Sequence, residues 1–275
     1  MTVKEVIDGI LKKTGVEPLP HDKTCDQLMT GSYDMEVKKI VTTFMATVEV
    51  IKKAIDIGAN LIITHEPTWF TGKDTTDWLK DDPVYRRKKE LIDQHNICIW
   101  RFHDHMHMDK EDGIYRGFDI EFGWGDYKIE NPASMKRFGA CYQLPETTLE
   151  ELCYFFKEKL NMQVVQIVGN PKMRVERVSV LVGGGSLGLG TEEMPMVLMN
   201  ENNLDLLICG EITEWTTTAY VRDAAELGFN KGMLVLGHER SEEPGMKHLG
   251  PWMEDIVQDI ETHFIDSKEP FKYIL

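Results

Sequence analysis

Apolar and polar residues along the first half of the chain follow two periods, one typical of helices and one typical of buried strands. Residues 2–15 begin with Thr2 and Glu5, which match a capping box, continue with an apolar stripe of helical spacing and end at Gly15; this pattern predicts a helix. The apolar runs KKIVTTFM and NLIITH flank the helical pattern TVEVIKKAIDIGA, and this order predicts two parallel strands joined by a helix. A further helix, DPVYRRKKELIDQHN, leads to the strand ICIWRFH.

The second half of the chain repeats this order of elements. The predicted elements are the helix TLEELCYFFKEKL, the strands MQVVQIVG, RVSVLVGGGS, LDLLICGE and KGMLVLGH, the helix TEWTTTAYVRDAAELG, and a long final helix from about 245 to 263. Gly, Pro and Asn residues between 123 and 145 mark the boundary between the halves. We therefore predict an α/β protein of two similar lobes with mostly parallel sheets, an N-terminal lobe at 1–125 and a C-terminal lobe at 126–275.

Two segments, one in each half, resemble each other. NLIITHEPTW (60–69) and LDLLICGEITEW (204–215) each lead from an apolar strand into a glutamate, with a tryptophan a few residues later. The likeness predicts that Glu66 and Glu211 follow equivalent strands. Ligands of open parallel sheets bind outside the carboxyl ends of the strands, so both residues are expected at a site. Trp69 and Trp215 are either flat surfaces for a ligand ring or ordinary packing residues.

Composition excludes several functions. The net charge of −15 argues against binding to nucleic acid or to an anionic membrane, since both would be repelled. The sequence shows neither an apolar run long enough to span a bilayer nor a signal peptide. The five cysteines are scattered and include no CxxC pair, which suggests reduced thiols in a cytoplasmic protein. A small molecule is the expected binding partner.

Three segments concentrate side chains that bind metal ions, each at the end of a predicted strand. They are THEP with His65 and Glu66, HDHMHMD with His103, Asp104, His105, His107 and Asp109, and GHERSEE with His238, Glu239, Glu242 and Glu243. Taken singly, a strand-end histidine next to an acidic residue is more often a hydrogen-bonded surface residue than a metal ligand. Imidazole combined with carboxylate suits zinc, iron, manganese or cobalt, and the coincidence of three such segments favours a metal site.

The middle segment constrains the geometry of such a site. On an extended strand, His103, His105, His107 and Asp109 would share one face, because alternate side chains point the same way. His105 and Asp109 would then lie roughly 13 Å apart, too far for one ion. Either the chain bends here or two ions lie side by side, and some of these residues must orient ligands or move protons instead.

In this order, the segments resemble the Nif-three-like dinuclear-metal proteins, often named GTP cyclohydrolase I type 2 homologues. The likeness is carried by TCDQLMTG, GANLIITHEP, FHDHMHMD, VLVGGGS, LLICGEITEW and LGHERSEEPGMKHL. The resemblance implies two α/β lobes that form one compact domain without an inserted domain, with a metal pair in the cleft between the lobes. It also implies a homohexamer.

The family's His-His-Pro, His-x-x-x-Asp and Gly-His-x-x-x-Glu motifs imply a ligand set. The implied metal ligands are His65, Glu66, His105, Asp109, His238 and Glu242. Glu211 matches a pocket residue, and His105 or Glu211 is the candidate for proton transfer. His103, His107 and Glu239 are expected around the ions. Glu66 stands where the family has a second histidine, which shifts the preference from zinc towards iron, manganese or magnesium and leaves open whether both ion positions survive.

The leading functional hypothesis is a metal-dependent hydrolase with two divalent ions, iron, manganese or zinc. Two ions about 3.5–4 Å apart can activate water and stabilise charge during hydrolysis. The substrate would be small and phosphorylated or nucleotide-like, and the reaction GTP cyclohydrolase-like or phosphoesterase-like. The alternative is a non-enzymatic metal store, carrier or regulatory partner. An interaction scaffold is a third possibility, and the sequence does not discriminate between them.

Overall fold

The computed structural model describes residues 1–132 and 135–274. It contains two compact units. Unit 1 comprises Met1–Gly117 and Glu243–Lys268, and unit 2 comprises Phe118–Glu242 together with the residues from Glu269 onward. Each unit has its own β-sheet and helices, so the predicted α/β class with two α/β halves is confirmed. No helix within the described parts is long and apolar enough to cross a membrane.

Unit 1 has a five-stranded sheet in the order β1-β4-β3-β2-β11. Its strands are β1 (Leu28–Thr30), β2 (Ile40–Thr43), β3 (Leu61–Thr64), β4 (Cys98–Arg101) and β11 (Thr262–Phe264). All neighbouring pairs are parallel except β1 with β4. Every residue of β2, β3 and β4 is buried, which is why these strands appear in the sequence as continuous apolar runs.

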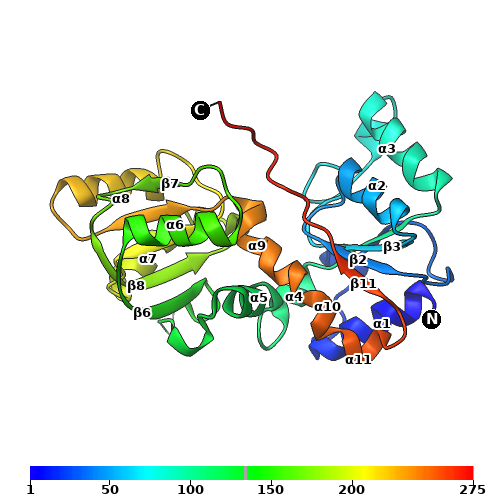
Figure 1. Cartoon of the computed structure of the whole chain (residues 1–275), viewed down its shortest axis with the longest axis horizontal. Helices are drawn as coiled ribbons and strands as arrows, with labels where there is room; N and C mark the ends of the chain where they lie inside the picture. Colours follow the sequence, from blue (N-terminus) through cyan, green and yellow to red (C-terminus); the bar gives the residue numbers. More distant parts are fainter. Residues whose placement is uncertain (133–134, 275) are drawn as a thin grey trace. The chain divides into compact units, whose positions relative to one another are not determined.

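Helices cover both faces of this sheet (Figure 1). They are α1 (Val3–Thr14), α2 (Val48–Asp56), α3 (Pro83–Gln94), α10 (Leu249–Trp252) and α11 (Glu254–Val257). The predicted first helix is confirmed with its caps. Thr2 and Glu5 form the reciprocal capping box, and Gly15 ends α1 in the left-handed conformation with φ 66°.

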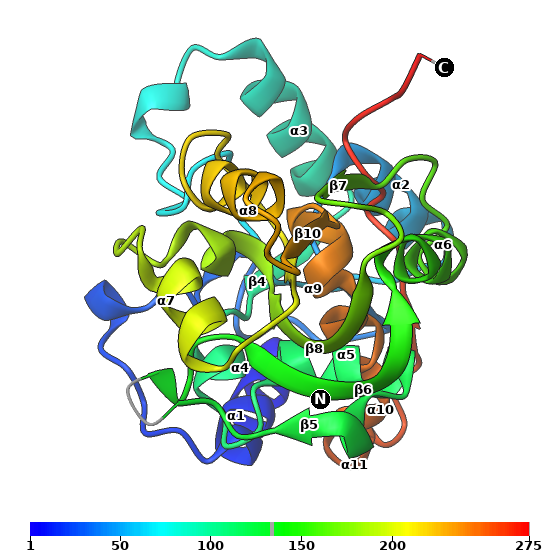
Figure 2. The same ribbon diagram turned by 90° about the vertical axis from the view of Figure 1, so that its left-hand side faces the viewer.

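Unit 2 has a six-stranded sheet in the order β5-β6-β8-β9-β10-β7. Its strands are β5 (Lys128–Ile129), β6 (Ala140–Thr148), β7 (Gln166–Val168), β8 (Arg174–Leu181), β9 (Leu206–Cys209) and β10 (Gly232–Val235). Only β8, β9 and β10 pair in parallel; the other neighbours are antiparallel, so this sheet is mixed rather than mostly parallel. Figure 2 shows β5, β6 and β8 side by side. Its helices are α6 (Leu149–Lys159), α7 (Met194–Glu201) and α8 (Thr217–Glu226).

Both units contain three adjacent parallel strands, and their carboxyl ends carry the candidate site residues. In unit 1, Glu66 follows the central strand β3 and His103 follows β4. In unit 2, Glu211 follows the central strand β9 and His238 follows β10. The sequence likeness between the two halves therefore reflects equivalent strands, with Glu66 and Glu211 at corresponding strand ends.

The C-terminal part of the chain differs from the prediction. The long helix expected from about 245 to 263 is absent; α9 (His238–Lys247), α10 and α11 are separate helices, followed by β11. Pro251 lacks a backbone N–H and interrupts the helical pattern. Because β11 pairs with β2, residues 243–268 join unit 1. The units thus divide differently from the predicted lobes at 1–125 and 126–275. The chain passes between them within α5 (Gly113–Phe122), within α9 and after Lys268.

Candidate metal centre

The histidine-rich segment after β4 is helical, not extended. Helix α4 (Asp104–Met108) starts directly after His103, which is its N-cap residue. The segment is therefore not an extended strand with all its histidines on one face; the chain bends here, which is one of the two alternatives that the sequence left open. On a helix, residues four apart lie on the same side. His103 and His107 consequently point the same way, whereas His105 points to another side of the helix.

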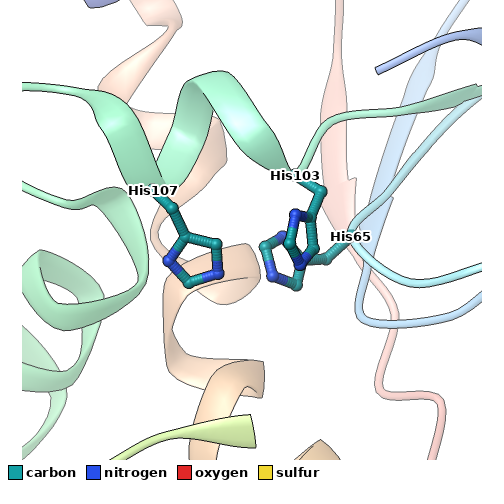
Figure 3. A group of neighbouring side chains, drawn as sticks. All are labelled: His65, His103 and His107. Carbon is teal, nitrogen blue, oxygen red and sulfur yellow. The ribbon is translucent and has the colours of Figure 1, made fainter. Parts of the chain in front are cut away.

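Three imidazoles meet in unit 1. His65, at the end of β3, and His103 and His107 each offer one ring nitrogen, and these nitrogens lie within 4.8 Å of one another. The ring centroids are 4.5 Å apart for His65 and His103, 5.0 Å for His65 and His107, and 4.8 Å for His103 and His107. Figure 3 shows the His65 and His103 rings next to each other, with the His107 ring directed toward them. We call this group the three-imidazole cluster.

Each ring of the three-imidazole cluster is oriented through its Nδ1 atom. The Nδ1 partners are the Phe102 carbonyl oxygen for His65 at 3.1 Å, Asp104 Oδ1 for His103 at 2.9 Å and Asp112 Oδ2 for His107 at 2.8 Å. A carbonyl or carboxylate oxygen accepts hydrogen bonds, so each Nδ1 donates its proton and Nε2 is the nitrogen that can bind an ion. This carboxylate- or carbonyl-held histidine is the usual arrangement of a metal ligand. The hydrogen bond from His103 also holds the pKa of Asp104 below its usual range.

His105 lies in the interior and is bound to Asp26. Its Nδ1 is 2.6 Å from Asp26 Oδ2, and the side chains are only 4% and 1% exposed. The same carboxylate accepts hydrogen bonds from the backbone N–H groups of His103, Asp104 and His105 at 2.6, 2.7 and 2.9 Å. Asp26 thus caps the first turn of α4. Sequence reasoning missed this residue because it lies far from α4 along the chain.

Asp109 forms an ion pair with an arginine. Its Oδ2 is 3.3 Å from a guanidinium nitrogen of Arg116. Among the described residues, His105 and Asp109 do not belong to a common group of three or more potential metal ligands. The structure brings together His103 and His107. These two residues are also four positions apart, and each lies two positions before its counterpart in the pair of His105 and Asp109.

Glu66 lies beside the cluster in a buried ion pair. Its Oε2 is 3.2 Å from Arg101 Nη2, with side-chain exposures of 14% and 4%, and its Oε1 is 3.8 Å from His103 Nε2. Arg101 also donates from Nε to the carbonyl oxygen of His65 at 3.1 Å and from Nη1 to that of Gly72 at 2.7 Å. The guanidinium therefore compensates the charge that Glu66 brings to this position.

In unit 2, His238 lies between two carboxylates. Its Nδ1 is 3.0 Å from Glu211 Oε1 and its Nε2 is 3.1 Å from Glu242 Oε2. Glu242 is one turn after His238 on α9 and is buried, whereas Glu211 is about half exposed. Glu239, expected near the ions, forms an ion pair with Arg240 at 3.2 Å. The structure therefore brings together three of the unit 2 residues that the sequence singled out.

The glycine-rich segment after β8 packs against this group. Gly183 begins a 3-10 helix (Gly183–Leu187) with φ 51°. A Cβ atom at this position would lie 2.0 Å from Glu242 Oε1 and 2.7 Å from His238 Nε2. The segment is thus a tight turn, and the absence of a side chain at Gly183 leaves room for His238 and Glu242.

Two other candidate features can be placed. Trp69 is buried and packs edge-on against Tyr85 with ring centroids 4.8 Å apart, so it is a packing residue, whereas Trp215 is 75% exposed.

Burial raises the pKa of the Cys25 thiol to about 12. Without a bound cation this thiol is protonated at neutral pH and is a poor nucleophile.

A family model described as Duf34/NIF3 (NGG1p interacting factor 3) matches residues 1–270. The chain belongs to the Duf34/NIF3 family. Curated relatives of this Duf34/NIF3 protein include a Clostridium perfringens protein named GTP cyclohydrolase 1 type 2 homolog, which is 27% identical over 255 residues and is aligned over 90% of each chain. A relative of the same name from Vibrio cholerae is 28% identical over 240 residues, covering 86% of this chain and 87% of its own.

Solved structures show the same fold. A Staphylococcus aureus hypothetical protein superposes on this Duf34/NIF3 chain with a TM-score of 0.74 at 19% identity, covering all of this chain and 99% of its own. A Bacillus cereus protein related to NIF3 gives a TM-score of 0.73 at 16% identity, with coverage of 100% and 99%. The resemblance stated from the sequence is therefore confirmed.

Proposed function

We propose that this Duf34/NIF3 protein is a metal-dependent hydrolase that binds two divalent ions per chain and acts on a small phosphorylated or nucleotide-like substrate in the cytoplasm. We also propose that it assembles as a homohexamer, as the family resemblance implies. The observation that carries the metal proposal is the three-imidazole cluster. Three rings oriented through Nδ1, with one nitrogen from each within 4.8 Å of the others, fit the donor set of a catalytic ion with an open position.

The ligand assignment follows from the contacts within each unit. In unit 1 we assign one ion to His65, His103 and His107, in place of the set with His105 and Asp109. In unit 2 we assign the donors His238 and Glu242, whose Nε2 and Oε2 lie 3.1 Å apart. Three imidazoles suit zinc or iron better than magnesium or calcium. The charge of Glu66 is compensated by Arg101, so it does not by itself impose a harder metal.

A divalent ion at these residues supplies Lewis-acid polarisation and lowers the pKa of water. The protein's own residues do the remaining work. Phe102, Asp104 and Asp112 keep the imidazoles oriented, and Glu211, half exposed and 3.0 Å from His238 Nδ1, is the group placed to exchange a proton with solvent or substrate. Buried His105, held by Asp26, positions α4 in this proposal and does not transfer protons.

Charge supports an anionic substrate held by cations. A chain with a net charge of −15 repels phosphates at long range, so bound cations are needed to attract them locally. The relatives' name, GTP cyclohydrolase 1 type 2 homolog, supports testing GTP. Phosphate esters are the other substrate class.

The ligand assignment is tested by elemental analysis of purified protein and its variants. His107→Asn should reduce the metal content by about one ion per chain, because a site with three protein ligands loses one. Asp109→Asn should keep the wild-type content, as should His95→Asn, which removes an exposed imidazole at the end of α3. If Asp109→Asn lowers the content and His107→Asn does not, the ligands are those implied by the family motif.

Hydrolysis is tested separately with p-nitrophenyl phosphate and GTP. Turnover should disappear after chelation, return with zinc or iron(II), and be lost in His107→Asn. An ion that remains bound during a substrate screen without turnover would contradict the hydrolase proposal and support the metal store or carrier.

A further inference from the structure

A second group of metal donors lies next to the three-imidazole cluster. Cys25, His103 and Asp104 each offer one ligand atom, and these atoms lie within 4.8 Å of one another. The three residues are partly buried. They come from the segment before β1 and from the start of α4, and His103 is the only residue that this group shares with the cluster.

The Asp104 carboxylate is fixed between the other two donors. Its Oδ1 lies 2.9 Å from His103 Nδ1, and its Oδ2 accepts hydrogen bonds from the backbone N–H of Cys25 and from Thr24 Oγ1, both at 2.9 Å. These contacts hold the segment that carries Cys25 against α4. The Cys25 thiol therefore lies beside the Asp104 carboxylate and the His103 imidazole, and the backbone does not have to move for the three side chains to bind one ion.

The two nitrogens of His103 face different groups. Nδ1 faces Asp104, whereas Nε2 lies 3.8 Å from Glu66 Oε1, next to His65. An ion bound at Cys25 would therefore use Nδ1, leaving Nε2 directed at the three-imidazole cluster. Sulfur, nitrogen and oxygen donors together suit a borderline cation such as zinc or cobalt better than magnesium or calcium.

We propose that Cys25, His103 and Asp104 form a separate binding site for a borderline divalent cation such as Zn²⁺ or Co²⁺, with His103 bound through Nδ1. On binding, the Cys25 thiol loses its proton to solvent, and His103 loses its Nδ1 proton and takes one up at Nε2. His103 then binds one ion at a time, either here through Nδ1 or in the three-imidazole cluster through Nε2. The site depends neither on hydrolysis nor on an ion in the three-imidazole cluster, although it shares one ring with that cluster.

Cys153 provides a matched control. Cys98, Cys141 and Cys209 are buried, whereas Cys25 and Cys153 are both partly exposed. Burial also raises the pKa of the Cys153 thiol, to about 11. Among the described residues, Cys25 is the only cysteine that belongs to a group of potential metal ligands. If Cys25 binds the cation and Cys153 does not, the cause is therefore the neighbouring donors of Cys25 and not the exposure of its thiol.

The test is a Co²⁺ titration of the full chain, followed by the near-ultraviolet thiolate-to-cobalt charge-transfer absorption. We expect the band in the wild type, its loss in Cys25→Ser and its retention in Cys153→Ser, with circular dichroism confirming that each variant is folded. Absence of the band in the wild type, or its survival in Cys25→Ser, would overturn the proposal.

A second measurement separates this site from the proposed hydrolytic centre. His107→Asn should lower the number of bound ions but keep the charge-transfer band, since His107 is not a donor at Cys25. At an alkaline pH at which iodoacetamide alkylates both thiols of the metal-free wild type, Zn²⁺ should abolish alkylation of Cys25 and leave Cys153 reactive, as measured by mass spectrometry. If Zn²⁺ does not protect Cys25, the site is rejected even where the three-imidazole cluster binds its ion.

Discussion

The carboxylate of Asp26 lies 2.6 Å from Nδ1 of His105, and both side chains are almost completely buried. His105 is thus one of three consecutive residues at the start of α4 whose backbone N–H groups donate to Asp26. The first N–H groups of a helix lack partners within the helix. Asp26 supplies those partners, and it thereby fixes the helix that carries His103 and His107.

Replacing Asp26 with asparagine should therefore damage both folding and metal binding. The amide has one acceptor oxygen and cannot replace a carboxylate that accepts four hydrogen bonds. We expect the free energy of unfolding to fall by about 3 kcal/mol, since buried donors lose their acceptor. Metal affinity should fall by about 10–100-fold, as is usual when a group that orients ligands is lost. Chemical denaturation and metal titration measure the two effects.

Asp22→Asn is the control for Asp26→Asn. Asp22 is exposed in the same N-terminal segment, so its replacement removes one negative charge without touching α4. Equal effects of the two substitutions on metal affinity would mean that general electrostatics, and not the cap on α4, explains the loss.

The order and class of most elements could be predicted from the sequence because they depend on local patterns. Buried parallel strands produce apolar runs, and the capping box of α1 lies within four neighbouring residues. The C-terminal part could not be predicted in this way. The pairing of β11 with β2 joins residues far apart in the chain, and three residues in that strand give almost no pattern of their own.

The segments that form the candidate site could be predicted from the sequence, but not which residues of the histidine-rich segment lie together. A run with histidines at 103, 105 and 107 fits an extended strand by alternation and a short helix by the spacing of 103 and 107. The partner that favours the helix is Asp26, and nothing in the local pattern reveals it. The family motif implies His105 and Asp109 as ligands, whereas the structure groups His103 and His107 with His65.

Gly183→Ala should disturb His238 and Glu242. A Cβ atom at Gly183 would occupy space held by Glu242 Oε1, and the backbone has φ 51°. We expect a loss of about 1–3 kcal/mol in unfolding free energy from the left-handed conformation alone, together with weaker metal binding. Gly184→Ala is the matched control, because its Cβ would meet no atom within 4 Å. Similar metal affinities for both variants would contradict this role of Gly183.

Lys88 should make stability depend on pH in the alkaline range. Burial lowers the pKa of Lys88 to about 8 from its ordinary value of 10.5, and its Nζ donates to the carbonyl oxygen of Thr68 at 2.8 Å. Between these two pH values the unfolded chain binds more protons than the folded one. The unfolding free energy of the wild type should therefore rise with pH, by up to about 3 kcal/mol, relative to a variant that lacks this amine.

The variant for this comparison is Lys88→Met, which keeps most of the apolar stem. The difference between the wild-type and Lys88→Met denaturation curves should grow from pH 8 towards 10.5. Lys89→Met removes a charge from the exposed side of the same helix, where Lys89 pairs with Asp93, and serves as the control. A wild-type minus Lys88→Met difference that does not change with pH would contradict the assignment.

Glu66 can act as the charge partner of Arg101 or as a metal ligand. Substitutions of Glu66 and Arg101 distinguish these two roles. If Glu66 acts as the partner of Arg101, Glu66→Gln should destabilise metal-free protein by about 3 kcal/mol, since it leaves a buried guanidinium uncompensated. The double variant with Arg101→Met should then lose less than the sum of the two single variants, with a coupling of about 1–3 kcal/mol. If Glu66 were chiefly a metal ligand, the metal-free proteins would show no coupling, and only the metal content would fall. Denaturation of the four chelator-treated proteins measures the coupling directly.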